Sequence, residues 1–299
     1  MIRTRALTKK FGALAAVDGV DLSVEAGEIF GLVGPDGAGK TTLMRMLLGI
    51  MEPTGGSVEV MGNSSIESVK KLIGYIPQKF SLYRDLTVME NIRMIGSMYG
   101  ADPTEINNRA REILSFTNLL PFADRLAENL SGGMKQKLAL AAGLMHKPRL
   151  FFLDEPTTGV DPVSRREFWQ MLYRLNKEGM TVFVSTPYMD EAELCTRVAF
   201  LHEGRVVSCA SPEELRSEYP YKILELAISG REVKKSLQDC NLVDINAFGE
   251  KYHLVTREPE QARETVVAAL ARSGFTGFSL AEVAPTLEDV FVALAGEAS

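Results

Sequence analysis

Apolar and polar residues alternate over most of residues 1–62, with the period of β-strands, and glycines interrupt the pattern. A short apolar run follows at Ile73–Gln78, and from Leu86 to about His146 the apolar spacing becomes helical. Breaks in that stretch fall at Asp102-Pro103 and Pro121. Strand-like runs return at 150–153, 181–185, 197–201 and 205–208, and a helical stretch at 161–178 separates the first two. This alternation predicts a mostly parallel sheet, and the helical insertion predicts a side lobe.

The pattern changes again near the end of the chain. Pro212 opens a helix, and Tyr219-Pro220 marks a boundary. The segments that follow are predicted as a strand at 222–228, a helix at 232–240, a hairpin of 242–248 with 252–256, a helix at 260–272, a strand at 278–283 and a helix at 287–295. The order β-α-β-β-α-β is typical of a ferredoxin-like unit. We therefore expect a first domain at 1–218, with a helical subdomain at about 79–148, and a second domain at 219–299.

A glycine-rich segment connects the apolar run at 28–33 to a second apolar run at 43–48. It reads Gly34-Pro35-Asp36-Gly37-Ala38-Gly39-Lys40-Thr41-Thr42. Its glycines allow positive φ and close approach of the backbone, so that N–H groups can converge on phosphate oxygens at a helix N-terminus. Lys40 supplies a point charge to the β and γ phosphates, and the Thr41 hydroxyl can ligate Mg²⁺. The segment predicts a nucleoside triphosphate as ligand, with all nine residues in contact with it.

Composition narrows the class of protein. The chain is 45% hydrophobic and 24% charged, which is the profile of a globular protein with an ample core, and its net charge of −6 argues against a nucleic-acid surface spread over the molecule. Cys195, Cys209 and Cys240 are far apart, which suits a reducing compartment and excludes a zinc site of the usual spacing. No apolar run approaches the ~20 residues that span a bilayer. We expect a cytoplasmic protein.

Two further segments carry candidate chemistry. Ser131-Gly132-Gly133 precedes a long helical run, so it predicts a helix N-terminus with exposed N–H groups. Asp154-Glu155 ends the apolar run at 150–153, and open α/β sheets bind ligands at the carboxyl ends of their strands. Paired acids before Pro156 could also cap a helix, but the position after a buried strand favours catalysis.

The segment Leu130–Gln136 resembles the signature sequence of ATP-binding-cassette (ABC) ATPases. Other motifs of that family stand in the family's order over roughly residues 1–215: the phosphate loop, Gln78 as the Q-loop, Leu150–Glu155 as the Walker B strand and Gly159–Pro162 as the D-loop. The resemblance implies an α/β fold with a P-loop NTPase core of the ABC ATPase type. The helical subdomain and the small α+β ferredoxin-like C-terminal domain complete the expected architecture.

The resemblance also implies roles for single residues. Asp154 would hold Mg²⁺ through water, with Thr41 and Gln78 as further contacts, and Glu155 would orient or deprotonate the attacking water. Phe11 occupies the position of the aromatic ring that stacks on adenine, although a core phenylalanine is a competing interpretation. In this family the signature, here Ser131-Gly132-Gly133, caps the γ-phosphate of ATP bound to the opposite subunit, and the D-loop with Asp161 crosses the dimer interface.

The end of the second domain, Pro285–Phe291, looks like the tail of bacterial drug-exporter ATPases of the daunorubicin-resistance type. The segments Gly34–Leu47, 77–80 and 86–91 resemble the amino-terminal cassette of a two-cassette multidrug-efflux ATPase. The resemblance implies an exporter subunit on the cytoplasmic face of the cell membrane. It would bind separate transmembrane permease subunits and form a homodimer, or a heterodimer with a second ABC ATPase. Candidate permease contacts, which could equally be core residues, are Phe80, Leu82, Tyr83 and Met89.

The chain departs from the family pattern at two positions. Pro187 stands where the family has a histidine that contacts the γ-phosphate, and proline offers no donor. Thr186 as N-cap and Pro187 as the first helical residue would make a favoured helix start. Asp36 stands where asparagine is commoner, and a carboxylate beside phosphates predicts a side chain that faces solvent or the partner. The chain's own site is expected to hydrolyse ATP slowly. An ATP-gated clamp with negligible hydrolysis and an ABC protein acting on nucleic acid remain alternatives, the second disfavoured by net acidity.

Overall fold

The computed structural model describes residues 1–100, 102–228, 233–249 and 251–297, and their contacts divide the chain into two compact units, Met1–Pro212 and Glu213–Ser299. Helix α7 (Pro212–Ser217) lies at the division. None of the helices within those described ranges is long and apolar enough to span a bilayer.

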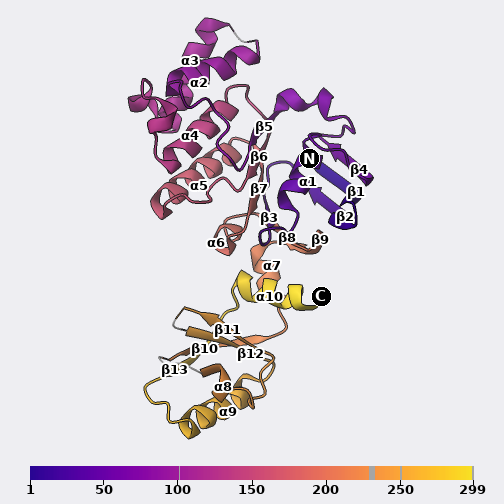
Figure 1. Ribbon diagram of the computed structural model, residues 1–299, viewed down its shortest axis with the longest axis vertical. Helices are drawn as coiled ribbons and strands as arrows, with labels where there is room; N and C mark the ends of the chain where they lie inside the picture. The colour runs from indigo at the N-terminus through magenta and orange to yellow at the C-terminus, as the bar shows by residue number, and fades with distance from the viewer. Residues whose placement is uncertain (101, 229–232, 250, 298–299) are drawn as a thin grey trace. The chain divides into compact units, whose positions relative to one another are not determined.

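The first unit is built on a six-stranded sheet (Figure 1). Its strands stand in the order β5 (Ile73–Ile76), β6 (Leu150–Asp154), β7 (Thr181–Thr186), β3 (Ile29–Val33), β8 (Arg197–His202) and β9 (Arg205–Ala210). All neighbours are parallel except β8 and β9. Every residue of β3, β6 and β7 is buried, as expected for strands covered on both faces. The predicted mostly parallel sheet is confirmed.

A second, antiparallel sheet consists of β2 (Leu14–Val24), β1 (Ile2–Phe11) and β4 (Gly55–Val60). The alternating pattern predicts these strands but not their separate sheet, because β1 pairs with residues about fifty positions further along the chain. One face of this sheet packs on α1 (Lys40–Leu47) and the core sheet, through a cluster that includes Leu7, Val20 and Leu43. The sheet therefore supports the phosphate loop from one side.

The helical lobe contains α2 (Val88–Met98), α3 (Pro103–Phe116) and α4 (Gly132–Gly143). Figure 1 shows these helices on one side of the core sheet and β1, β2 and β4 on the other. The helix starts follow the sequence: Thr87 and Glu90 form a capping box, and Asp102 caps α3 with Pro103 as its first residue. The remaining elements of this unit are α5 (Pro162–Lys177), α6 (Met189–Ala192) and short 3₁₀ turns at Ile66–Ser68, Lys70–Leu72, Leu120–Phe122 and Ala127–Asn129.

The second unit has the predicted ferredoxin-like order. Its elements are β10 (Lys222–Ala227), α8 (Val233–Ser236), β11 (Asp244–Phe248), β12 (Lys251–Thr256), α9 (Pro259–Arg272), β13 (Ser279–Val283) and α10 (Leu287–Glu297). The sheet order β11-β12-β10-β13, antiparallel throughout, interleaves the two β-α-β halves. The predicted helix at 232–240 is shorter than expected, since α8 ends at Ser236 and Glu232 lies outside the described residues. In the tail segment, Asp289 accepts hydrogen bonds from Thr286 and contacts His253, which anchors α10 to the sheet.

Candidate nucleotide site

The glycine-rich segment forms a tight loop from the end of β3 to the start of α1. Gly37 and Gly39 have φ of 84° and 105°, a region that other residues rarely adopt. Gly34 does not have a positive φ. It is needed for space, because a Cβ there would lie 2.2 Å from the Leu201 carbonyl oxygen. Of the two expected roles of glycine in this loop, Gly37 and Gly39 thus have positive φ, and Gly34 allows close approach of the backbone. Asp36, at the tip of the loop, is exposed.

Lys40 is 4% exposed and points back into this loop. Its Nζ donates to the carbonyl oxygens of Gly34 at 2.8 Å and Pro35 at 3.0 Å, and it lies 3.1 Å from Oε1 of Glu155. A buried ammonium group is costly unless oxygens surround it. Phosphate oxygens can take the same positions around Nζ, so the loop holds Lys40 where it can bind them.

Asp154 has the arrangement expected of a magnesium contact. It is 1% exposed, and its Oδ1 accepts hydrogen bonds from Thr41 Oγ1 at 3.2 Å and Ser185 Oγ at 2.7 Å. Its Oδ2 is buried and finds no hydrogen-bond partner within the described part of the chain. An orphaned carboxylate oxygen is costly, and Mg²⁺ or a water bound to it would satisfy this one. The residues at this position therefore fit the ion.

Glu155 has a φ of 48°, an uncommon conformation for a residue with a side chain. Its N–H donates to both the carbonyl and the hydroxyl oxygen of Ser185, each at 3.1 Å. Its Oε2 accepts from Gln78 Nε2 at 2.8 Å, while Oε1 faces Lys40. No helix starts at this carboxylate pair, because Asp161 caps the next helix. The helix-cap alternative for Asp154-Glu155 is therefore wrong.

Other predicted contacts lie around this centre. Thr42 lies in the first turn of α1, and Ala38 is buried in the loop. Phe11 is 49% exposed, with Lys9 Nζ 5.5 Å from its ring centre, so the core alternative is wrong. Gln78 reaches Glu155 although its side chain is exposed. The structure thus assembles the phosphate loop, both carboxylates and Gln78 into one cluster.

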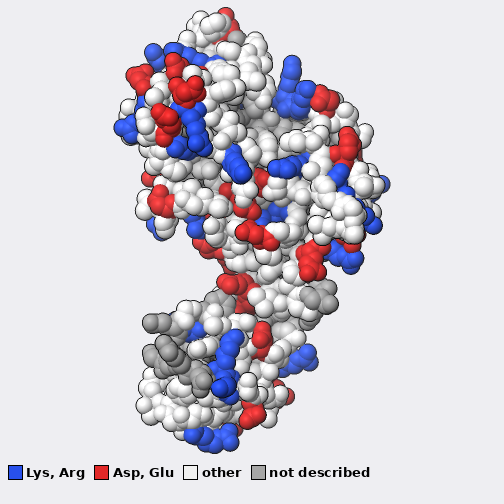
Figure 2. All heavy atoms as spheres, viewed as in Figure 1, with Lys and Arg blue, Asp and Glu red and all other residues white. Residues whose placement is uncertain are grey.

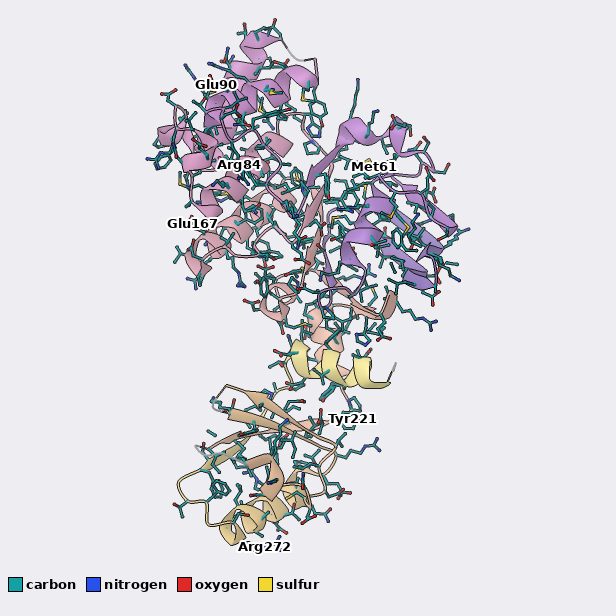
Figure 3. The ribbon with its side chains drawn as sticks, in the orientation of Figure 1. Met61, Arg84, Glu90, Glu167, Tyr221 and Arg272 are labelled. Carbon is teal, nitrogen blue, oxygen red and sulfur yellow. The ribbon has the colours of Figure 1, made fainter. Side chains whose placement is uncertain are left out.

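The signature segment belongs to a different cluster. Ser131 is exposed and caps α4 by accepting from the Met134 N–H. Gly132 is exposed too, whereas Gly133 packs on α5 so closely that a Cβ would lie 2.5 Å from Ser164. Lys137 and Glu167 join the same two helices at 2.5 Å, and Figure 3 labels Glu167 on α5. No hydrogen bond or ion pair between described residues joins this cluster to the phosphate loop.

Asp161 caps α5 in this structure. Its Oδ1 accepts from the N–H groups of Ser164 at 2.9 Å and Val163 at 3.1 Å. The hydrogen bonds from Ser164, followed by that from Val163, hold the pKa of Asp161 below its ordinary value. Its side chain therefore orders the start of α5, directly against Gly133 of the signature.

The predicted helix start at Thr186-Pro187 is wrong. β7 continues through Thr186, and α6 begins only at Met189, with the extended residue Tyr188 as its N-cap. The Thr186 hydroxyl donates to Oε2 of Glu191 at 2.7 Å and accepts from the Tyr188 N–H at 3.1 Å. Because this hydroxyl is bonded to a buried carboxylate, it does not cap a helix. Pro187 follows directly after the carboxyl end of β7, next to the strand that carries Asp154.

Sequence reasoning missed Ser185 and Glu191. Ser185 pairs in register with Asp154 on the neighbouring parallel strand, and its hydroxyl donates to the Asp154 carboxylate and accepts from the backbone N–H of Glu155. The sequence does carry a signal for Ser185, because it is the polar residue that ends the apolar run at 181–185. Parallel strands have their carboxyl ends at the same edge of the sheet, so Ser185 could be expected beside Asp154. Glu191 lies in an acidic stretch that looks solvent-exposed, and the sequence gives no signal for its burial.

The loop, the orphaned carboxylate oxygen and the adjacent glutamate together define a phosphate-loop nucleotide-binding domain. The family described as ABC transporter matches residues 17–158. The chain is 37% identical to the Nod factor export ATP-binding protein I of Rhizobium sp. (strain N33), over 96% of this chain and 94% of that one. It is 36% identical to the daunorubicin/doxorubicin resistance ATP-binding protein DrrA of Streptomyces peucetius, over 99% and 92%. The chain therefore belongs to the ATP-binding proteins of ABC transporters, which are ATPases.

Three further proteins extend this result. The chain is 38% identical, over its whole length, to the probable multidrug ABC transporter ATP-binding protein YbhF of Escherichia coli (strain K12). It spans about half, 52%, of the length of that protein. Among solved structures, the ATP-binding cassette MJ0796, in a dimeric post-hydrolysis state with ADP and Pi, is 28% identical in sequence to this chain. It superposes with a TM-score of 0.65 over 71% of this chain and 98% of that one. The cbiO1 protein of Clostridium perfringens, 25% identical, gives a TM-score of 0.67 over 80% and 94%.

Proposed function

We propose that this chain is the ATP-hydrolysing subunit of an ABC exporter and that it couples ATP-driven closure of two cassettes to transport by separate membrane subunits. The observation that carries the proposal is the cluster around Lys40. There a buried ammonium and the Glu155 carboxylate meet an oxygen of Asp154 that has no partner among the described residues. Relatives named for multidrug, daunorubicin and Nod factor export support the exporter class. The chain would lie on the cytoplasmic face of the cell membrane, bound to its permease.

The residues of this site have separate roles in ATP hydrolysis. Lys40 and the loop N–H groups bind the β and γ phosphates, and Phe11 covers the adenine. Thr41 and Asp154, with Gln78, would hold Mg²⁺, which would neutralise charge on the phosphates. Glu155 orients a water molecule towards the γ-phosphorus and takes its proton as the bond to the leaving ADP breaks.

A second cassette completes the site in this proposal. The exposed N-terminus of α4, with Ser131 and Gly132, would close over the γ-phosphate that the other cassette holds, and Asp161 would lie at the interface between the two. Pro187 offers no donor to that phosphate, so this chain's own site would be slow while its signature completes a partner's site. The second cassette is either another copy of this chain or a different ABC ATPase.

The same Pro187 favours a second candidate, an ATP-gated clamp with negligible hydrolysis. Steady-state phosphate release from the purified chain with ATP and Mg²⁺ separates the two. Slow release that saturates with ATP supports the enzyme, whereas ATP-dependent dimers that release no phosphate support the clamp. A nucleic-acid role gains no support from the face in Figure 2, where Lys and Arg are interspersed with Asp and Glu.

A groove on the helical lobe offers a surface for the permease. Its cavity of about 270 Å³ is lined by Tyr75, Ile76, Pro77, Ser81, Leu82, Tyr83, Ile95, Met98, Tyr99, Ala139, Ala142, Gly143 and His146. Buried Asn91 fixes its rim, because its side chain bonds to both the N–H and the carbonyl of Tyr83, each at 2.9 Å. Tyr83 is 49% exposed and Met98 72%. Of the predicted contacts, Leu82 and Tyr83 line this groove, while Phe80 and Met89 are half-buried outside it.

Placing charges in this groove is expected to release the chain from membranes. Leu82→Glu with Tyr83→Glu would put carboxylates into an apolar contact, so permease binding is lost because the charges cannot be desolvated there. The measurement is co-purification of the chain with its permease from membranes. Ile50→Glu is the control, since Ile50 is 60% exposed outside the groove. Retained co-purification of the folded double variant would refute this docking surface.

A further inference from the structure

Glu191 is a buried carboxylate that the nucleotide site does not use directly. It is 1% exposed on the short helix α6. Its Oε1 accepts from Thr157 Oγ1 at 2.5 Å and lies 3.2 Å from Arg165 Nε, and its Oε2 accepts from Thr186 Oγ1 at 2.7 Å. Both carboxylate oxygens are therefore partnered, which offsets the cost of burying the charge.

The three partners of Glu191 come from separate segments of the site. Thr157 follows Glu155 by two residues, with only Pro156 between them. Thr186 ends β7 and directly precedes Pro187. Arg165 lies in the first turns of α5, the helix that Asp161 caps. One carboxylate thus joins the segment after Glu155, the strand end before Pro187 and the start of α5.

Glu155 needs this kind of support. Its φ of 48° is sparsely populated, and such a conformation persists only when surrounding contacts hold it. Ser185 fixes its N–H from the strand side, and the Thr157–Glu191 hydrogen bond fixes the chain just beyond it. A displacement of about 1 Å at a reacting group can cost about 10²-fold in rate.

Arg165 extends the network. Besides Glu191 it binds Asp190 at 2.7 Å and lies over the Tyr188 ring at 4.7 Å, so it also holds the segment that follows Pro187. On α5, Ser164 and Glu167 contact Gly133 and Lys137 of the signature helix. The signature helix and Glu155 are therefore connected through Arg165 and Glu191.

We propose that Glu191 is a positioning residue for ATP hydrolysis, whose carboxylate holds Glu155 and the end of β7 in place relative to α5. The inference rests on the proposed ATPase function and adds a residue that touches neither nucleotide nor water. It acts on the geometry of the hydrolytic step and not on the phosphate loop. Its removal should lower the turnover number without weakening ATP binding.

The test compares Glu191→Gln with the wild-type chain by phosphate release, by titration with a fluorescent ATP analogue and by thermal unfolding. Gln keeps the size of the side chain but cannot accept from Thr157, Thr186 and Arg165 with two charged oxygens. The expected result is a fall in kcat of about 10²-fold, with KM and Kd for the nucleotide changed by less than about two-fold. Asp190→Asn is the control. Asp190 also binds Arg165 but is 72% exposed, so its rate should stay near wild type.

Thr157→Val is a second variant, which keeps the inference testable if Glu191→Gln does not fold. It should lower kcat in the same direction, and the double variant should lose little more than Glu191→Gln alone, because both break one network. An unchanged rate in Glu191→Gln, or equal loss of kcat and nucleotide affinity, would overturn the positioning role while leaving the proposed function standing. A wild-type chain that binds ATP but releases no phosphate would refute the proposed function, and this inference with it.

Discussion

Glu155→Gln is expected to reduce phosphate release by about 10²–10⁴-fold while ATP binding is retained, because the amide can neither take a proton nor hold the attacking water as a carboxylate does. The substitution preserves the hydrogen bond from Gln78 to the side-chain oxygen. It also removes the negative charge beside Lys40, so phosphate oxygens lose a competitor for that ammonium. The variant should therefore accumulate in the ATP-bound state. Phosphate release at saturating ATP and nucleotide titration measure the two effects.

The matched control is Glu203→Gln. Glu203 also has a positive φ, 46°, but it is exposed in the turn between β8 and β9. The same change of charge at the same kind of backbone position should leave turnover intact. If Glu155→Gln released phosphate at the wild-type rate, Glu155 would not be the catalytic carboxylate, and the mechanism above would fail.

Pro187→His is expected to raise turnover by up to about 10²–10³-fold, the range associated with one preorganised donor to a developing charge. The backbone can accept the change, because Tyr188 is extended and α6 starts only at Met189, so no helix depends on the proline. The Thr186 contact with Glu191 should also remain. The measurement is phosphate release by the purified chain at saturating ATP.

Pro187→Ala separates the added donor from the lost ring, and it should give no gain. If the wild-type chain already turns over as fast as ordinary ABC ATPases and Pro187→His adds nothing, the idea of a slow, asymmetric site is wrong. If both variants released phosphate faster than the wild-type chain, the slow hydrolysis would be explained by the backbone restriction that the proline imposes.

The sequence predicted those parts of the molecule whose physical cause is local. Continuous apolar runs identified β3, β6 and β7, and the helix predicted from Asp161 starts there because a short acid before proline caps a helix well. Asp102-Pro103 was predicted only as a break in the helical stretch, and in the structure Asp102 caps α3. The phosphate loop was predictable because only glycine fits at 37 and 39 and because Lys40 has no other obvious role there. The ferredoxin-like order followed from element spacing alone.

What the sequence did not predict depends on contacts between distant segments. The pairing of β1 with β4 is not encoded in the alternation of either strand. Thr186 looked like a helix cap, but its hydroxyl is bonded to a carboxylate that the local pattern places at the surface. The burial of Glu191 likewise depends on which strands lie side by side, as does the Asp154 oxygen that has no partner within the described part of the chain. The candidate site was thus predicted as a set of ligand contacts, and its supporting network was not.

The central claim is that Lys40 of one cassette and Ser131 of a second one close on the same ATP. It is tested most directly by mixing two variants, each made in the Glu155→Gln background. Lys40→Ala and Ser131→Arg each leave no complete site in their own dimers, whereas a mixed dimer contains one site with both residues intact. With ATP and Mg²⁺, we predict dimers by analytical ultracentrifugation in the equimolar mixture and monomers for either variant alone. A mixture that stays monomeric while the parent dimerises, or a Lys40→Ala chain that dimerises like the parent, would contradict the account.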